Sequence, residues 1–125
     1  MSNTCIIPKT EEFFEAIAEL CPVAIYSKDL AGRLIYFNDA FARFFESGRK
    51  LLGQTLHDLL PDEVAAPLEA NDRRVLEGGT PEEFEETVTV AGKTLTFLSV
   101  KFPLRDPAEK VCALAAISID ITDWT

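Results

Sequence analysis

The sequence predicts an α+β fold, in which a five-stranded antiparallel sheet carries short helices on one face and is preceded by an N-terminal flanking helix. Three observations favour this fold. Apolar residues near the N-terminus follow a helical spacing, five later segments have the alternating or continuously apolar pattern of strands, and turn residues separate neighbouring strands. The order helix, two strands, several short helices, three strands is typical of a sheet with its helices gathered on one side.

The N-terminal part predicts a tail, a helix and a β-hairpin. Residues 1–9 form the tail, and Thr10 caps a helix that Pro22 stops. A strand over residues 23–28 and a second over residues 33–37 follow, joined by a turn in which glycine supplies the unusual dihedral angles.

The middle of the chain predicts three short helices. Asn38 caps the first, which carries Phe41, Phe44 and Phe45 on one side. Thr55 and Asp58 form the capping-box pattern of a second helix. A third opens at Pro67 and is closed by Gly78-Gly79.

The last third of the chain predicts three strands. They cover residues 84–90, 95–104 and 111–121, with turns at Ala91-Gly92 and over residues 106–109. The third of these strands is the most apolar, which places it at the centre of the sheet. We therefore expect Cys112 to be a small core residue.

Composition limits the function of the chain. Its 125 residues fit one domain, and 47% hydrophobic residues allow a packed core. A net charge of −9 without a basic face argues against nucleic-acid binding. There is no apolar run of membrane-spanning length and no secretory signal pattern. Three scattered cysteines indicate reduced thiols, so we expect a cytoplasmic protein.

Four segments together resemble the PAS family of sensory domains. They are Asp29-Leu30-Ala31-Gly32-Arg33, Ile35-Tyr36-Phe37-Asn38-Asp39-Ala40-Phe41, Lys101-Phe102-Pro103-Leu104-Arg105-Asp106 and Asp120-Ile121-Thr122. The resemblance covers residues 10–122 and implies a sensor domain, with residues 123–125 as the start of an output linker. In this family the D-I-T tripeptide joins the sensor to its output, so Asp120, Ile121 and Thr122 are the expected signal junction. The implied parent is a signalling protein, in the first place a sensor histidine kinase.

Departures from the family pattern bear on cofactors. Many members have glycine in the turn before the last strand, where this chain has Glu109, so we expect that turn to be built differently. The reactive-cysteine motif of the light-sensing members is absent, and the expected long helix over residues 67–76 contains no histidine. The resemblance therefore argues against a flavin adduct and against haem, and the ligand stays unknown.

The aromatic residues leave two interpretations open: a filled core, or a small apolar pocket with a few polar groups. If a pocket exists, we expect it to be lined by residues of the inner sheet face and the helices. These are Tyr26, Phe37, Phe41, Phe44, Val75, Phe97, Ser99 and Ser118.

Other polar candidates have simpler explanations. His57 is the sole histidine, and we expect a surface or capping role for it rather than metal binding or phosphotransfer. The run Glu82, Glu83, Glu85, Glu86 is interpreted as a solvated rim, because strand alternation divides it between two faces. Asp120 is expected to accept hydrogen bonds from nearby backbone or from Lys101 or Arg105. No metal site and no catalytic pair is predicted.

The preferred hypothesis is a cytoplasmic PAS-type sensor domain, itself non-catalytic, which binds a small molecule or a partner and relays the signal through Asp120-Ile121-Thr122. One alternative is a ligand-free dimerisation module, and a weaker one is a small α+β enzyme with a buried carboxylate. A broad apolar stripe on the N-terminal helix predicts a weak homodimer in either of the first two cases. Its residues are Phe13, Phe14, Ile17 and Leu20.

Overall fold

The structure, a computed structural model, describes residues 10–20 and 22–123 and confirms the predicted fold class. Five antiparallel strands form one sheet in the order β2-β1-β5-β4-β3, so the most apolar strand is central as predicted. The strands are β1 (Ala24–Asp29), β2 (Leu34–Phe37), β3 (Glu82–Val90), β4 (Lys93–Arg105) and β5 (Val111–Asp120). The helices are α1 (Thr10–Leu20), α2 (Asp39–Ala42), α3 (Leu56–Leu59) and α4 (Asp62–Gly78).

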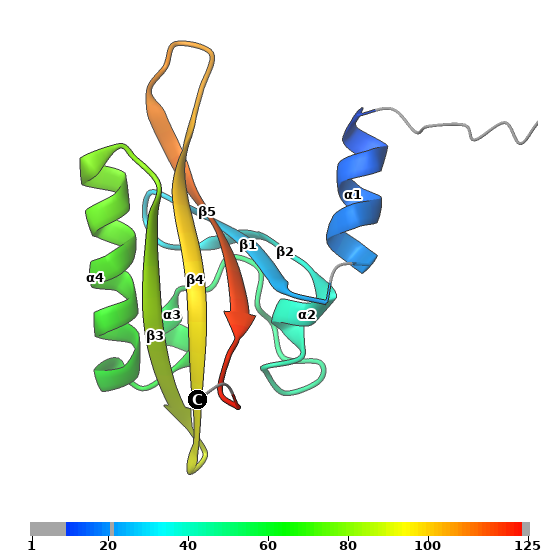
Figure 1. Cartoon of the computed structure of the whole chain (residues 1–125), viewed down its shortest axis with the longest axis vertical. Helices are drawn as coiled ribbons and strands as arrows, with labels where there is room; N and C mark the ends of the chain where they lie inside the picture. The colour runs from blue at the N-terminus through cyan, green and yellow to red at the C-terminus, as the bar shows by residue number, and fades with distance from the viewer. Residues whose placement is uncertain (1–9, 21, 124–125) are drawn as a thin grey trace, which may run out of the picture.

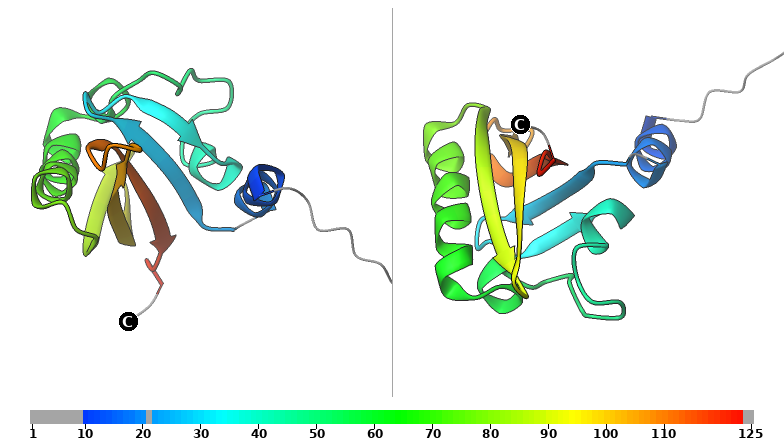
Figure 2. Two further views of the ribbon diagram at one scale, coloured as in Figure 1. Left: turned by 90° about the horizontal axis from the view of Figure 1, so that it is seen from above. Right: turned by 60° about the horizontal axis from the view of Figure 1, so that its bottom comes forward.

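Two helices lie at opposite ends of the molecule. In all views α4 lies beside β3 on one side and α1 stands on the other, beyond β1 and β2 (Figures 1 and 2). Between them, the core joins one sheet face to α2, α3 and α4. Its buried members include Tyr26 and Ala116 from strands and Phe41, Leu59 and Leu68 from helices. The predicted arrangement of helices on one sheet face is therefore confirmed.

Two predicted helix caps are confirmed. Thr55 and Asp58 form a complete capping box at the start of α3. Asn38 caps α2 by accepting a hydrogen bond from the Phe41 N–H at 3.0 Å. The Asn38 side chain is fully buried and also connects three other backbone groups: its Oδ1 accepts from Ile25 N, and its Nδ2 donates to Ala18 O and to Val23 O. This one amide therefore fastens the end of α1, the start of β1 and α2 together.

Helix α4 begins earlier than predicted. It starts at Asp62 after Pro61 and contains Pro67 inside it, whereas we expected Pro67 to open it. The longer helix gains a first turn with two acidic side chains at the positive end of the helix dipole, and it buries Ala65 completely. These gains offset the backbone hydrogen bond that Pro67 cannot make.

Two further expectations are wrong. Helix α2 ends at Ala42, so Phe44 and Phe45 lie beyond it rather than on it. Cys112 is exposed, not a core residue. The register between β4 and β5 shifts at Leu104/Arg105, directly opposite this position, and such a bulge turns a residue out of the regular inward and outward alternation.

Candidate functional site

A cavity of about 110 Å³ lies between the inner face of the sheet and the helical side of the domain. It is lined by Ala24, Tyr26, Phe41, Phe44, Phe45, Leu56, Leu60, Leu68, Glu86, Val88, Leu95, Phe97, Lys101 and Ser118. The β-strands contribute residues at alternate positions, which point to the same face of the sheet.

Five of the eight predicted pocket residues lie on this cavity, namely Tyr26, Phe41, Phe44, Phe97 and Ser118. The other three lie behind its wall. Phe37 packs against Phe41 with ring centroids 5.8 Å apart, and Val75 is fully buried on α4. Ser99 shares a hydrogen bond of 2.8 Å with Ser118.

The wall of the cavity is mainly apolar, with five aromatic and six aliphatic residues. The Tyr26 and Phe41 rings are 4.8 Å apart, and Phe41 in turn lies 5.3 Å from Phe45. Phe44 meets Phe97 edge to face at 5.0 Å. Phe44 is 42% exposed, so it forms the rim where the cavity meets solvent. The exposed faces and edges of such rings favour contact with another flat apolar group.

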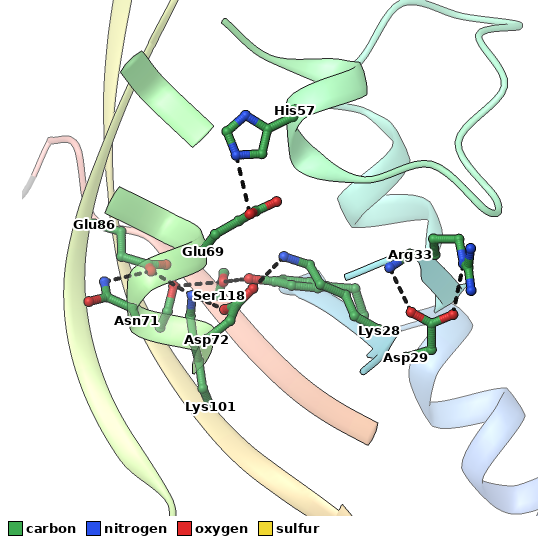
Figure 3. Close-up of polar contacts among 12 residues, drawn as sticks. Lys28, Asp29, Arg33, His57, Glu69, Asn71, Asp72, Glu86, Lys101 and Ser118 are labelled. Carbon is green, nitrogen blue, oxygen red and sulfur yellow. Dashed lines mark hydrogen bonds and ion pairs between the residues drawn. The ribbon is translucent and has the colours of Figure 1, made fainter. Parts of the chain in front are cut away.

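One end of the cavity is polar because a buried ionic cluster reaches it (Figure 3). Asp72 of α4 accepts hydrogen bonds from Lys28 at 2.7 Å and from Lys101 at 2.6 Å. The Lys101 ammonium also lies 2.6 Å from Glu86 Oε2, to which Asn71 donates at 3.0 Å. We call Lys28, Asp72, Glu86 and Lys101 the ionic cluster. All four residues are buried, so each charge has a direct counter-charge in place of water.

The ionic cluster corrects one expectation and removes Lys101 from the expected donors to Asp120, which accepts from the Thr122 backbone instead, as the other predicted alternative has it. Glu86 is 6% exposed and ion-paired, so the interpretation of the acidic run as a solvated rim is wrong for this residue. Lys101 points inward to Asp72 and Glu86, and it does not reach Asp120. Arg105, the other expected partner, donates to the carbonyls of Gly79 and Glu109. The alternation of the strands did indicate that these side chains point inward. Lys28, Glu86 and Lys101 each lie two residues from an inward-facing residue of the same strand, namely Tyr26, Val88 and Ser99.

Burial and charge shape the protonation of these groups. Burial raises the pKa of the Tyr26 hydroxyl to about 12, although the nearby Lys101 ammonium opposes this effect. Burial also lowers the pKa of Lys28, against the opposing attraction of Asp72. For Lys101, burial alone lowers the pKa, but the Tyr26 phenolate and the carboxylates of Asp72 and Glu86 raise it above its ordinary value. At neutral pH, Tyr26 is therefore a neutral hydroxyl and Lys101 a cation.

The predicted signal junction is tied to the neighbouring strand. Asp120 accepts hydrogen bonds from the backbone N–H and the hydroxyl of Thr122, and these bonds lower the pKa of its carboxyl group. The Thr122 hydroxyl accepts a hydrogen bond from Thr96 N at 3.0 Å, and Ile121 N donates to Thr96 O at 2.8 Å. The chain thus leaves the sheet at Ile121 and Thr122, which are both hydrogen-bonded to Thr96 of β4.

His57 lies on the surface between two helices, as predicted for a capping-region residue. Its Nδ1 lies 2.8 Å from an Asp62 oxygen. Its Nε2 lies 3.2 Å from a Glu69 oxygen (Figure 3). The hydrogen bond with Asp62, helped by Glu69, raises the pKa of His57. Because both carboxylates belong to α4, the protonated ring connects α3 to α4. No group of three or more potential metal ligands occurs among the described residues.

Comparison with known families identifies the fold family of this architecture. The family model described as PAS fold matches residues 18–124. The chain belongs to the PAS family. A curated relative, the methanogenesis regulatory histidine kinase FilI of Methanothrix harundinacea, is 34% identical over 118 residues, which cover 91% of this chain. This PAS domain spans 13% of the length of that kinase.

Solved PAS structures have the same fold. A PAS domain from Colwellia psychrerythraea matches with a TM-score of 0.77 at 17% identity, covering 92% of this chain and 99% of its own. The PAS domain of Bordetella pertussis BvgS matches with a TM-score of 0.73 at 26% identity, covering 90% and 86%. Vibrio cholerae VqmA, solved with a ligand and DNA, gives 0.78 at 23% identity, covering 93% of this chain and 53% of its own. PAS domains are sensory rather than catalytic, so this domain is a sensory module. Among its described helices, none has the length and apolar character needed to cross a bilayer.

Proposed function

We propose that this PAS domain is the cytoplasmic sensor of a histidine kinase, that it binds a small molecule in the cavity behind α2, α3 and α4, and that it relays binding through Asp120-Ile121-Thr122. The kinase assignment is supported by the relative FilI, whose name identifies it as a histidine kinase. The coding sequence beyond Thr125 provides a direct check. A heptad-patterned helix carrying a phospho-accepting histidine supports the kinase, and a different output domain contradicts it.

The position of Phe97 is the main support for the proposed relay of the signal. Its ring lines the cavity, and the preceding residue, Thr96, holds Ile121 and Thr122 through its backbone groups. Phe97 is also paired in register with Asp120. A ligand that moves the Phe97 ring therefore acts one residue away from the bonds that fix the exit of the chain. A bias of about 1.4 kcal/mol at that point changes the ratio of two states roughly tenfold.

A cavity-filling substitution tests this coupling. Val88→Phe places a ring in the cavity, whereas the matched control Thr87→Phe places the same ring on the exposed outer face of β3. We expect Val88→Phe to change the hydrogen-exchange rate of the Ile121 and Thr122 amides by at least about threefold, and Thr87→Phe to leave both rates unchanged. Equal rates in the two variants and the wild type would contradict the relay.

Haem and covalently attached flavin remain poor candidates for the ligand. The cavity of about 110 Å³ is below the roughly 150 Å³ of a cavity that holds one benzene ring in another protein, so either group would require extensive rearrangement. We therefore expect the purified protein to be colourless, and a visible absorption band that persists through gel filtration would overturn this expectation.

A second function, dimerisation without a ligand, is favoured by the surface of α1. Phe14, Ile17 and Leu20 are 54%, 48% and 84% exposed, although Phe14 also lies near Tyr36 of β2, with ring centroids 6.1 Å apart. The Phe13 side chain, also part of the predicted stripe, lies outside the described residues. Native mass spectrometry discriminates the two functions, since a dimer without a bound small molecule favours the dimerisation module. A monomer at high micromolar concentration by sedimentation, unchanged by deletion of residues 1–21, contradicts the predicted dimer.

A further inference from the structure

The cavity specifies the chemistry of its ligand more narrowly than a sensory function requires. We infer that this PAS domain takes a neutral, single-ring aromatic molecule that carries one hydrogen-bond donor, and that the donor binds to the free oxygen of Glu86. This inference rests on the proposed ligand-binding function of the same cavity.

The size of the cavity sets an upper limit to one ring. Its volume is about 110 Å³. An engineered apolar cavity of about 150 Å³ in another protein holds one benzene molecule. A two-ring compound therefore exceeds the cavity, whereas a six-membered ring is closer to its size and can extend past the exposed rim residue Phe44.

The shape of the wall favours a flat aromatic ring. Five aromatic rings line the apolar part: Tyr26, Phe41 and Phe45 meet at tilted angles, and Phe97 meets Phe44 edge to face. A further aromatic ring completes these contacts on both its face and its edge. A saturated ring of equal size loses this part of the interaction.

The polar end provides an acceptor rather than a free charge. Glu86 Oε2 is occupied by Lys101 and Asn71, but Oε1 accepts no hydrogen bond from any residue that the structure describes. The Glu86 side chain is 5% exposed and lines the cavity, so a ligand donor is a suitable partner for this oxygen. The hydroxyls of Tyr26 and Ser118, 3.3 Å apart, lie on the same wall and adapt as donor or acceptor.

The charges of the ionic cluster exclude a charged ligand. Two ammonium groups, Lys28 and Lys101, face two carboxylates, Asp72 and Glu86, so the cluster is formally neutral. An anion would lie against Glu86 without a free cation, and a cation would compete with Lys101 for carboxylates already paired. Either case leaves a charge without a counter-charge of its own beside the buried cluster.

A matched ligand series tests the inference by isothermal titration calorimetry on the whole chain. Phenol carries the ring and the donor, anisole has the donor methylated, benzoate and benzylamine carry a negative and a positive charge, and cyclohexanol lacks the aromatic ring. We expect phenol to bind at least about tenfold more tightly than anisole, the loss that one hydrogen bond to a buried charged group causes. We also expect it to bind more tightly than benzoate and benzylamine, which bring a charge, and than cyclohexanol, which lacks the aromatic ring. A tighter binding of benzoate or benzylamine, or equal binding of phenol and anisole, overturns the inference.

The variant Glu86→Gln locates the donor. Lys101 and Asn71 keep the amide oxygen at the Oε2 position, which places the amide NH₂ at the Oε1 position and turns the cavity acceptor into a donor. The advantage of phenol over anisole should then fall from at least about tenfold to less than about twofold. An unchanged advantage overturns the role of Glu86. If this variant does not fold, the wild-type series still decides the ligand class.

The location of binding separates failure of the inference from failure of the proposed function. Val88→Phe should abolish phenol binding, and Thr87→Phe should retain it. If benzoate is preferred and Val88→Phe abolishes its binding, the ligand class is wrong but the sensory cavity stands. If no compound binds at about 10 mM, a concentration at which even very small ligands of a fitting cavity are detected, the inference is wrong. If Val88→Phe in addition leaves the junction exchange rates unchanged, the proposed function is wrong as well.

Discussion

The substitution Asn38→Asp is expected to be among the most destabilising single-atom changes in this domain. It replaces the side-chain NH₂ by oxygen and leaves the shape almost unchanged. The two hydrogen bonds accepted by Oδ1, from Ile25 N and Phe41 N, survive. The two donated by Nδ2, to Ala18 O and Val23 O at 2.9 Å each, become contacts between oxygens.

The magnitude follows from the buried partners. Each carbonyl left without a donor costs about 1–3 kcal/mol, so the two together cost about 2–6 kcal/mol. Since Asn38 is 1% exposed, neither solvent nor movement of the side chain supplies a replacement. A typical domain has a free energy of unfolding of roughly 5–15 kcal/mol, so the loss is a large part of the total. Because Ala18 belongs to α1, the same change loosens α1 from the sheet.

Urea unfolding followed by far-UV circular dichroism measures the effect at several pH values. The burial of the new carboxyl raises its folded pKa above the unfolded value of about 3.9. The penalty is therefore largest at neutral pH and shrinks as the pH falls through the folded pKa, because the protonated acid donates to one of the two carbonyls. Thr55→Ala, which removes the partly exposed cap of α3, is the control and should cost about 1 kcal/mol. If Asn38→Asp unfolds within about 1 kcal/mol of the wild type at pH 7, the accounting of these hydrogen bonds is wrong.

Three further predictions concern exposed positions. The pKa of His57 is raised, first by the hydrogen bond with Asp62 and then by Glu69. The wild-type domain should therefore be more stable than His57→Gln by its full amount below pH 6.5, and this difference should vanish as the pH rises through the raised pKa. A difference in urea midpoint that does not change with pH contradicts this. Glu109 has a φ of 67°, a conformation that glycine adopts without strain. Glu109→Gly should therefore leave the free energy of unfolding unchanged or raise it by up to about 1 kcal/mol. A clear drop of the melting temperature argues against backbone strain in this turn. Asp120→Ala should cost roughly 1–2 kcal/mol at most, yet remove the stimulus dependence of the output of the full-length protein or lock that output. If the variant domain unfolds, Asp120 is a structural cap, and if stability and regulation are both unchanged, the junction role is contradicted.

Most of the fold could be predicted because its local signals agree with one another. Every strand begins and ends at most two residues from the predicted limit, since turns rich in glycine and polar residues separate clearly apolar segments. The turn at Glu109 adopts a backbone conformation typical of glycine although the residue is not glycine. Its φ of 67° is the left-handed conformation that glycine favours, so the backbone resembles the family pattern although the side chain does not.

The errors arose where tertiary contacts decide. The start of α4 was misplaced because Pro67 is a strong local signal for a helix start, while the burial of Ala65 that favours an earlier start is not visible in local sequence. The ionic cluster was missed for a similar reason. Lys28, Asp72, Glu86 and Lys101 come from four elements, and the residues that form ion pairs are 15 to 44 positions apart, so no spacing rule brings them together. Their pairing depends on the sheet order and on the rotation of α4 about its axis.

The ionic cluster has a consequence for signalling. Replacing a buried ion network by apolar residues of similar size is often neutral or stabilising, so stability alone gives little reason for four buried charges. The geometry of the cluster gives a better reason for these buried charges. Asp72 holds α4 to β1 through Lys28 and to β4 through Lys101, while the adjacent Asn71 holds α4 to β3 through Glu86. Sliding or rotation of α4 breaks all three connections at once, which gives the helix one preferred position rather than a continuous range.

A ligand donor on Glu86 would act on this arrangement directly. It would withdraw negative charge from Glu86 and weaken the attraction that Glu86 exerts on Lys101 and Asn71. Lys101 lies on β4 four residues after Phe97, and Phe97 follows the residue that holds the junction. The same strand thus connects the polar end of the cavity, its aromatic wall and the exit of the chain. A ligand that contacts both ends of the cavity would change the position of α4 and the junction together, which is the property that a two-state sensor requires.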